Sequence, residues 1–157
     1  MSLAIEDIKK QIWQLLKSVP DPEIPVINIV ELGVVRNVDV TKNGIEITIT
    51  PTYSGCPAMK LFENEIVSNL KQQGYKNITI KMIYSPAWTT DWLSNQAKQK
   101  LKEYGIAPPK NKKEINVNCP QCNSSSTEVI SEFGSTACKA LYRCKNCLEP
   151  FDYFKCI

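Results

Sequence analysis

The sequence of 157 residues contains no histidine, and this absence removes several classes of active site. Without an imidazole, the chain cannot form a Ser-His-Asp or Cys-His pair, an H-E-x-x-H zinc site or a facial triad of two histidines and a carboxylate. A di-iron site built on Glu-x-x-His motifs is excluded for the same reason. We therefore expect no catalytic activity from this chain alone, and only an accessory part in any oxygen chemistry.

Long apolar runs and dense basic runs are also missing. No segment approaches the roughly 18 to 20 apolar residues that a membrane span requires, and the N-terminal MSLAIEDIKKQ has charges where a secretory signal would be apolar. The formal net charge is only +3, and acidic residues are interspersed with the basic ones. We expect a cytoplasmic protein that binds neither membranes nor nucleic acids, in a compartment where thiols stay reduced.

Cysteine, in contrast, is concentrated near the C-terminus, where six of the seven cysteines lie. Two C-x-x-C pairs are separated by the 21 residues 123–143. They consist of Cys119 and Cys122, then Cys144 and Cys147. In a reducing compartment this spacing is typical of four thiolates around one tetrahedral ion, and because protein fills all four positions the ion would be structural. Zn²⁺ is favoured by availability, although an iron centre of rubredoxin type uses the same ligands.

The segments between the two pairs support a zinc ribbon. TEVIS and ALYRC can pair as short strands that bring the C-x-x-C turns together, and FDYFKCI reads as an apolar terminal strand. Cys138 and Cys156 lie outside the four-ligand set. Packing is the favoured role for these two additional thiols, and the alternatives are a substitute ligand, a disulfide or a second weak metal site.

The N-terminal part reads as a mixed α/β domain. Apolar residues at three- and four-residue steps predict an amphipathic helix that Pro20 ends. The alternating GIEITIT segment predicts an antiparallel hairpin turning at Asn43-Gly44. A second helix is expected from Pro57 to near Gly74, followed by the strand NITIKMIYS.

A third long helix is expected over residues 89–105, with Thr89 or Thr90 as its N-cap, Tyr104 facing inward and Gly105 as its end. The fold class is therefore α+β: a small α/β domain (1–106), a linker rich in proline and lysine (107–114) and the zinc ribbon (115–157).

Cys56 stands apart in the sequence Ser-Gly-Cys-Pro. A cysteine at the N-cap of a helix is exposed to the helix dipole, which favours thiolate and makes the sulfur nucleophilic or a soft metal ligand. The alternative is a buried cap residue without chemistry. Asp21 and Glu23 lie on a proline-stiffened loop, DPEIP, where they could bind a hard cation or hydrogen-bond the helix start near Cys56, or be ordinary turn residues.

Two known families resemble this chain. DPEIP (21–25), NIVELG (28–33) and the SGCP segment that follows Thr52 are similar to the MIP18 family, also called DUF59, whose members assist iron-sulfur cluster assembly. ISEFGSTACKA (130–140) and EPFDYFKC (149–156) resemble the D-subunit family of phenylacetyl-CoA epoxidases.

The resemblance implies an accessory role in phenylacetate degradation, in the maturation of iron-sulfur or di-iron centres of a multicomponent epoxidase. It implies that Cys56, Asp21 and Glu23 are candidates for transient binding of iron or a cluster. Other epoxidase subunits, and iron-sulfur assembly proteins, are the implied partners. The alternative is a non-catalytic structural subunit of the epoxidase.

Overall fold

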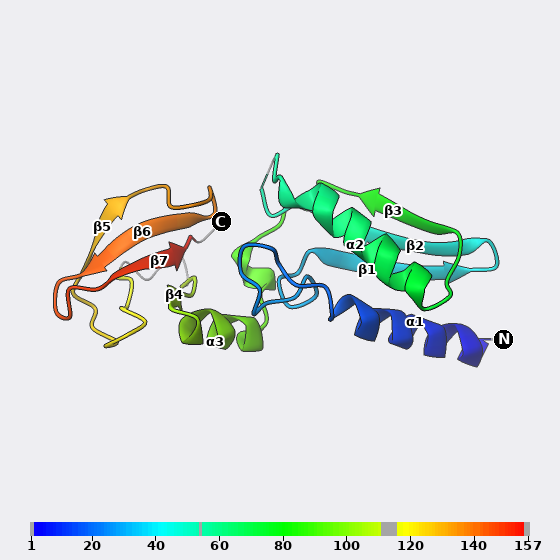
Figure 1. Cartoon of the computed structure of the whole chain (residues 1–157), viewed down its shortest axis with the longest axis horizontal. Coiled ribbons are helices and arrows are strands. Elements are labelled where there is room, and N and C mark those ends of the chain that lie inside the picture. The colour runs from blue at the N-terminus through cyan, green and yellow to red at the C-terminus, as the bar shows by residue number, and fades with distance from the viewer. Residues whose placement is uncertain (1, 54, 111–115, 156–157) are drawn as a thin grey trace. The chain divides into compact units, whose positions relative to one another are not determined.

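The computed structural model describes residues 2–53, 55–110 and 116–155, which belong to two compact units (Figure 1). We call them the α/β unit (Met1–Trp88) and the ribbon unit (Thr89–Ile157). The α/β unit contains α1 (Ser2–Leu16), β1 (Val35–Thr41), β2 (Gly44–Ile49), α2 (Ala58–Gln72) and β3 (Ile78–Met82). The ribbon unit contains the 3-10 helix η1 (Thr90–Trp92), α3 (Asn95–Glu103), β4 (Ile106–Ala107), β5 (Thr127–Ser131), β6 (Lys139–Cys144) and β7 (Pro150–Phe154).

The α/β unit is built on a three-stranded sheet with the order β1-β2-β3. The predicted hairpin is confirmed, since β1 and β2 pair antiparallel, but its turn lies at Lys42-Asn43 because Thr41 already pairs with Gly44. β3 returns parallel to β2, as a strand that follows a crossover helix does. A Cβ atom on Gly44 would clash with the carbonyl oxygen of Asn77, so this close approach requires glycine.

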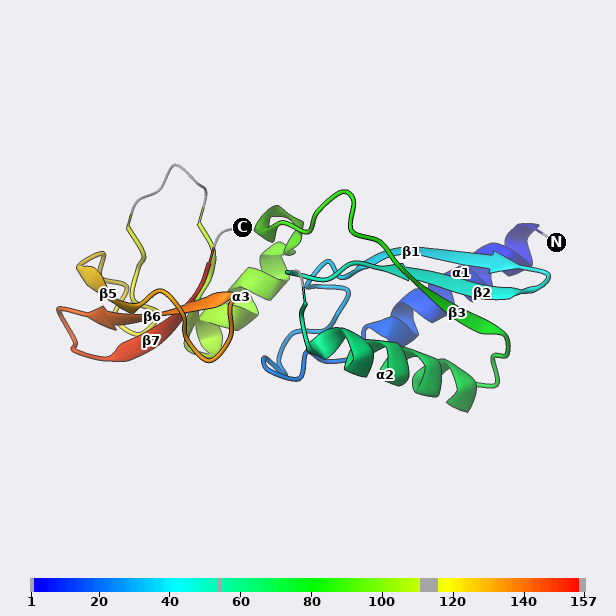
Figure 2. The same cartoon turned by 90° about the horizontal axis from the view of Figure 1, so that it is seen from above.

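Helices α1 and α2 cover one face of this sheet (Figures 1 and 2). The core between the layers is mainly aliphatic, and its most buried members include Ile12, Leu16, Ile29, Ile47, Ile49, Phe62, Ile66 and Leu70. The first helix ends at Leu16 and not at Pro20, because the chain leaves the helix through 3-10-type bonds from Ser18 to Leu15 and from Val19 to Leu16. The core of the α/β unit forms from the predicted apolar stripes, and none of the four grouped cysteines belongs to it.

The ribbon unit has a four-stranded sheet with the order β4-β7-β6-β5. The predicted pairing of TEVIS with ALYRC is confirmed: β5 and β6 are antiparallel, with Glu128 opposite Arg143. β7 continues the antiparallel arrangement, and the short β4 adds to β7 in parallel. Within the described residues, no helix combines the length and the apolar content needed to cross a membrane.

The third predicted helix is in fact two shorter elements. Thr89 caps η1, its hydroxyl oxygen accepting a hydrogen bond from the Asp91 N–H at 3.2 Å. The chain is then extended, and Ser94 caps α3 by accepting a bond from the Ala97 N–H at 3.0 Å. A second strong N-cap residue shortly after the first thus restarts the helix. Tyr104 is 50% exposed and not inward-facing.

The division between the units also differs from the expected domain boundary at residue 106. The compact units separate between Trp88 and Thr89, which places η1 and α3 with the ribbon. The cause is β4, at the border of the expected linker, because it pairs with β7 and contacts α3. Residues 111–115 of that linker lie outside the described residues.

Candidate metal centre

The sulfur atoms of four cysteines converge at one end of the ribbon sheet. All of them lie within 4.8 Å of one another, and they belong to Cys119, Cys122, Cys144 and Cys147. Cys144 is the last residue of β6, whereas the other three lie in the turns beside the sheet. Pairing of β5 with β6 therefore brings together ligands that are more than twenty positions apart in the sequence.

The distances between the sulfurs fit a tetrahedral ion. The Sγ atoms of Cys119 and Cys147 are 3.7 Å apart, and those of Cys122 and Cys144 are 3.5 Å apart. Zinc–sulfur bonds of about 2.3 Å in a tetrahedron place the sulfurs about 3.8 Å from each other. The described residues thus hold four soft ligands at the spacing that Zn²⁺ requires.

Both C-x-x-C turns are built in the same way. After each second cysteine comes a residue in the left-handed region, Asn123 with φ +63° and Leu148 with φ +67°. These residues reverse the chain, so that the Cys119 N–H donates to Ser124 O at 2.9 Å and the Cys144 N–H donates to Glu149 O at 3.0 Å. Asparagine adopts this conformation readily, and the leucine does so because the turn constrains it.

Hydrogen bonds to Cys144 favour its thiolate form. Its sulfur accepts the backbone N–H groups of Cys147 and Asn146, each at 3.4 Å. The N–H of Cys147 is the main cause that lowers the pKa of Cys144 to about 6, against the opposing effect of burial. For Cys147, the N–H of Glu149 lowers the pKa, but burial and the neighbouring thiols outweigh it and raise the pKa to about 12. The backbone thus favours the charged form of the Cys144 sulfur, which is the form in which a cysteine binds a cation.

The apolar core beneath the cysteines is small. It comprises Ala107, Val117, Cys119, Cys144 and Phe151, with Tyr142 and Tyr153 packed against it. Tyr142 stacks on Phe151 with ring centroids 5.9 Å apart and meets Tyr153 edge-on at 5.4 Å. Two of the five members of this core, Cys119 and Cys144, are also candidate ligands. A bound metal would therefore hold in place residues that the core itself contains.

Of the two additional thiols, only Cys138 lies in the described part of the chain. Its side chain is 6% exposed, and its sulfur is 3.0 Å from the Thr136 hydroxyl. It does not belong to the four-cysteine group. Cys156 lies outside the described residues.

Cys56 does not sit where the sequence pattern placed it. The N-cap of α2 is Pro57, with φ −70° and ψ −19°, and no side chain caps the helix there. Cys56 is one residue earlier and half-buried, with its carbonyl accepting the Met59 N–H at 3.4 Å. Its sulfur lies 4.0 Å from the hydroxyl oxygen of the buried Thr52. The thiol is thus placed before the first turn of α2 and is partly open to solvent.

Asp21 has a defined structural role in the DPEIP loop. Its Oδ1 atom accepts the N–H groups of Glu23 and Ile24, both at 2.8 Å, which closes an Asx turn. The Asp21 N–H donates in turn to Ile27 O at 2.8 Å. This turn leaves Glu23 exposed.

A second turn follows in NIVELG and ends at Gly33, as the sequence pattern predicts. Asn28 Oδ1 accepts the N–H groups of Val30 and Glu31, and Glu31 Oε2 accepts the Asn28 N–H at 3.2 Å. This reciprocal pair has the form of a capping box. An asparagine followed three positions later by a glutamate was the available signal.

The two candidate sites differ in how many possible ligand atoms lie close together. Among the described residues, the ribbon cysteines are the one group of three or more Cys, Asp or Glu side chains whose ligand atoms lie close enough to share an ion. Cys56, Asp21 and Glu23 form no such group. The described residues therefore bring the four ribbon cysteines together as one candidate metal centre and leave the half-buried Cys56 thiol outside any such group.

Comparison with known families gives the class of protein. Residues 9–82 match the family model described as iron-sulfur cluster assembly protein, and residues 107–155 match the PaaD zinc beta ribbon domain. A DUF59 domain of unknown function from Bacillus anthracis, known from a crystal structure, superposes with a TM-score of 0.61 and 27% identity, covering 64% of this chain and 97% of that one. The expected α+β fold with a C-terminal zinc ribbon is confirmed.

Two curated relatives place the chain more closely. It is 51% identical over 152 residues, 94% of this chain and 92% of the relative, to the D subunit of the "Putative 1,2-phenylacetyl-CoA epoxidase" of Escherichia coli (strain K12). A Porphyromonas gingivalis Fe-S protein maturation auxiliary factor is 34% identical over 59% of this chain and 90% of its own length. The chain belongs to the family of phenylacetyl-CoA epoxidase D subunits.

Proposed function

We propose that this protein is an accessory factor that helps to assemble the iron centres, iron-sulfur or di-iron, of a multicomponent phenylacetyl-CoA epoxidase. The observation that carries the proposal is the union, in one chain, of an iron-sulfur assembly domain with a ribbon specific to the D-subunit family. The absence of histidine from the sequence supports an accessory role, because the usual bases and oxygen-activating iron ligands are missing. The reducing cytosol is the compartment that suits its reduced thiols.

The ribbon would bind one structural Zn²⁺ through Cys119, Cys122, Cys144 and Cys147. Zinc supplies no redox chemistry, and four protein ligands leave no position for water, so its contribution would be to fold the ribbon. The ribbon folded by zinc could then contact the other epoxidase subunits.

Cys56 is the candidate for transient binding of the iron or cluster that is delivered. It is half-buried and precedes the first turn of α2, so an incoming metal can reach its sulfur without unfolding of the domain. Because the described residues hold no assembled second ligand group around it, binding there would be weak and suited to transfer. Glu23, exposed on the loop that Asp21 braces, is the candidate second ligand.

The test is the iron content of the epoxidase matured with variants of this protein. Cys56→Ser should lower iron loading several-fold and leave the zinc content of the protein at one per chain, since the ribbon ligands are untouched. Glu23→Gln should have a smaller effect in the same direction. Glu65→Gln, which changes an exposed carboxylate of α2, is the matched control. Full iron loading with Cys56→Ser would rule out the transfer role.

The second candidate function is a structural subunit, which the name of the Escherichia coli relative favours. Copurification with the catalytic subunits at fixed stoichiometry, together with iron loading that does not depend on Cys56, would support that role. Loss of epoxidase activity only under iron limitation would support the assembly role.

A further inference from the structure

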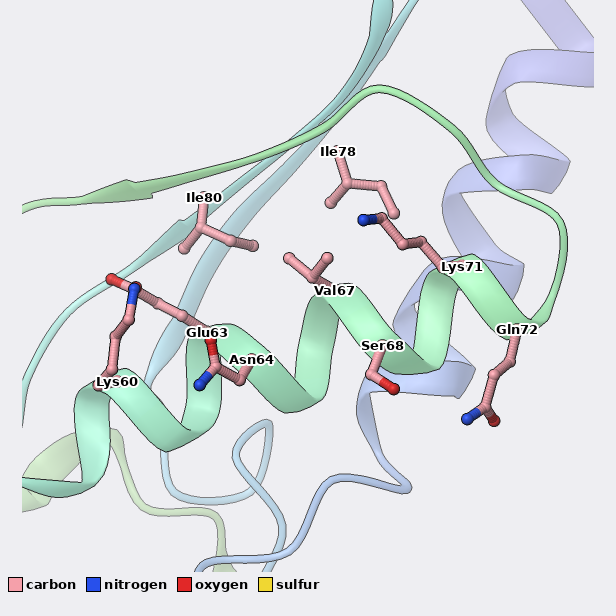
Figure 3. Close-up of a pocket in the computed structure, with 9 residues that line it drawn as sticks. All are labelled: Lys60, Glu63, Asn64, Val67, Ser68, Lys71, Gln72, Ile78 and Ile80. Carbon is pink, nitrogen blue, oxygen red and sulfur yellow. The ribbon is translucent and has the colours of Figure 1, made fainter.

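We infer that the outer edge of β3 and the adjoining side of α2 form a docking groove for an extended, acidic segment of a partner protein. The groove has a volume of about 630 Å³, and its lining includes Lys60, Glu63, Val67 and Lys71 of α2 and Ile78 and Ile80 of β3 (Figure 3). The inference concerns protein recognition and does not depend on whether Cys56 takes up iron.

β3 is an edge strand with outward-pointing backbone groups. Within the described residues, it pairs only with β2 in the three-stranded sheet. The bonds from Ile45 N–H to Asn77 O and from Ile83 N–H to Ile49 O show that Asn77 and Ile83 point their backbone groups toward β2. Because these groups alternate along a strand, those of Ile78, Ile80 and Met82 point outward. The edge therefore offers a ladder on which an added strand can pair.

The floor of the groove is apolar. Ile78 and Ile80 point from β3 toward Val67 of α2, and the three side chains gather at the centre of the groove in Figure 3. All three are half-buried, so part of their apolar surface remains open to solvent. An added strand would place every second side chain over this floor, which favours a segment with apolar residues at alternate positions.

The charge at one end of the groove selects an acidic partner. Beyond Ile78 the groove continues into a second hollow of about 490 Å³, lined by Lys71, Gly74, Tyr75, Lys76, Asn77 and Ile78. The residues that line this hollow include two lysines and no carboxylate. At the opposite end, Glu63 is already neutralised by Lys60, with Nζ to Oε2 at 3.0 Å. The basic end is thus complementary to an acidic residue or a terminal carboxylate.

The same charges disfavour a second copy of this chain as the occupant. Lys81 lies on β3 itself, and Lys76 lies two residues before the strand begins. Pairing two β3 edges would bring these lysines near those of the other copy, and lysines on edge strands are a common means of preventing self-association.

The experiment uses random dodecapeptides displayed on phage and panned against the full-length, zinc-loaded protein. Enriched peptides should carry apolar residues at alternate positions with Asp or Glu near one end. Val67→Glu should abolish the enrichment. Lys71→Glu should weaken binding of a synthetic enriched peptide about tenfold. Lys81→Glu makes the same charge change on the opposite face of β3 and should alter affinity less than about twofold.

The inference is overturned if Val67→Glu leaves the enrichment unchanged, if Lys71→Glu and Lys81→Glu act alike, or if the protein dimerises through β3. Circular dichroism and zinc content verify that each variant is folded. Cys56→Ser separates this inference from the proposed function, because it should lower iron loading and leave peptide affinity as it is.

Discussion

The two units of this chain differ in which residues their buried clusters contain. The α/β unit buries aliphatic side chains from two helices between its layers, and none of the four cysteines of the metal centre belongs to that core. In the ribbon unit, the buried cluster around the cysteines has five members, and two of them are candidate metal ligands. A segment that buries little apolar surface can be stabilised by a metal instead, so we expect the ribbon cluster to depend on a bound ion and the α/β core not to.

The largest effect should come from removing the metal ligands. Cys144→Ser removes the ligand whose thiolate the backbone already stabilises, and structural zinc in small domains contributes about 10 kcal/mol or more to folding. We expect the variant to lose its zinc and the β5–β7 amide signals to lose dispersion, while β1–β3 signals persist. Heteronuclear NMR and metal analysis measure this. A ribbon that stays folded without metal would contradict the contrast between the units.

Truncation of a buried side chain in the α/β unit should destabilise that unit and leave the ribbon unit intact. Ile47 is 0% exposed at the centre of β2, so Ile47→Ala should destabilise the α/β unit by about 2 to 5 kcal/mol and leave the zinc content unchanged. Leu61→Ala, at a residue that is 44% exposed, should cost less than about 1 kcal/mol. Denaturant unfolding monitored by β1–β3 signals checks both. Equal effects of the two variants would disprove the assignment of the core.

Substitutions of Asp21 separate its turn role from a ligand role. Asp21→Ala removes the acceptor of two backbone bonds and should destabilise the α/β unit by about 1 to 2 kcal/mol, whereas Asp21→Asn keeps an acceptor and should cost less. Thermal unfolding measures both. If iron loading of the epoxidase falls with Asp21→Asn while stability holds, the carboxylate acts on iron directly; unchanged loading limits Asp21 to the turn.

The smallest effect is expected at the break between η1 and α3. Ser94→Ala removes the cap of α3 and should destabilise the ribbon unit by about 1 kcal/mol. Ser94→Asp retains an acceptor and should restore the stability. Because α3 contacts β4, which pairs with β7, the loss should appear in the ribbon signals. A loss confined to β1–β3 would contradict the division at Trp88.

Periodicity predicted most of the fold because the signals were strong and local. The alternation in GIEITIT predicted β2, and the spacing of the C-x-x-C pairs predicted a four-sulfur centre that the structure assembles. The prediction of one long helix over residues 89–105 was wrong, and the reason is also local. Thr89 and Ser94 are both good N-cap residues, and the apolar pattern does not show that each of them starts its own helix.

The candidate site around Cys56 was less predictable. The sequence pattern placed Cys56 at the N-cap, whereas Pro57 occupies that position and Cys56 precedes it. The pattern allowed Asp21 to be either a turn residue or a ligand, and the structure shows its turn. The position of Cys56 and the role of Asp21 both depend on backbone angles in short loops, where a shift of one residue changes which atoms a side chain can reach.

By itself, the sequence determined the chemistry available to this protein: no imidazole, one lone thiol before a helix and two cysteine pairs at the spacing of a metal site. Tertiary structure alone decided that β4 joins the ribbon, that β3 has an open edge beside Val67, and that no second ligand group assembles around Cys56 in the described part of the chain. The physical reason is the distance along the chain between the residues that determine each feature. Ligand type and spacing are properties of neighbouring residues, whereas strand order and open edges depend on pairing between segments far apart in the chain.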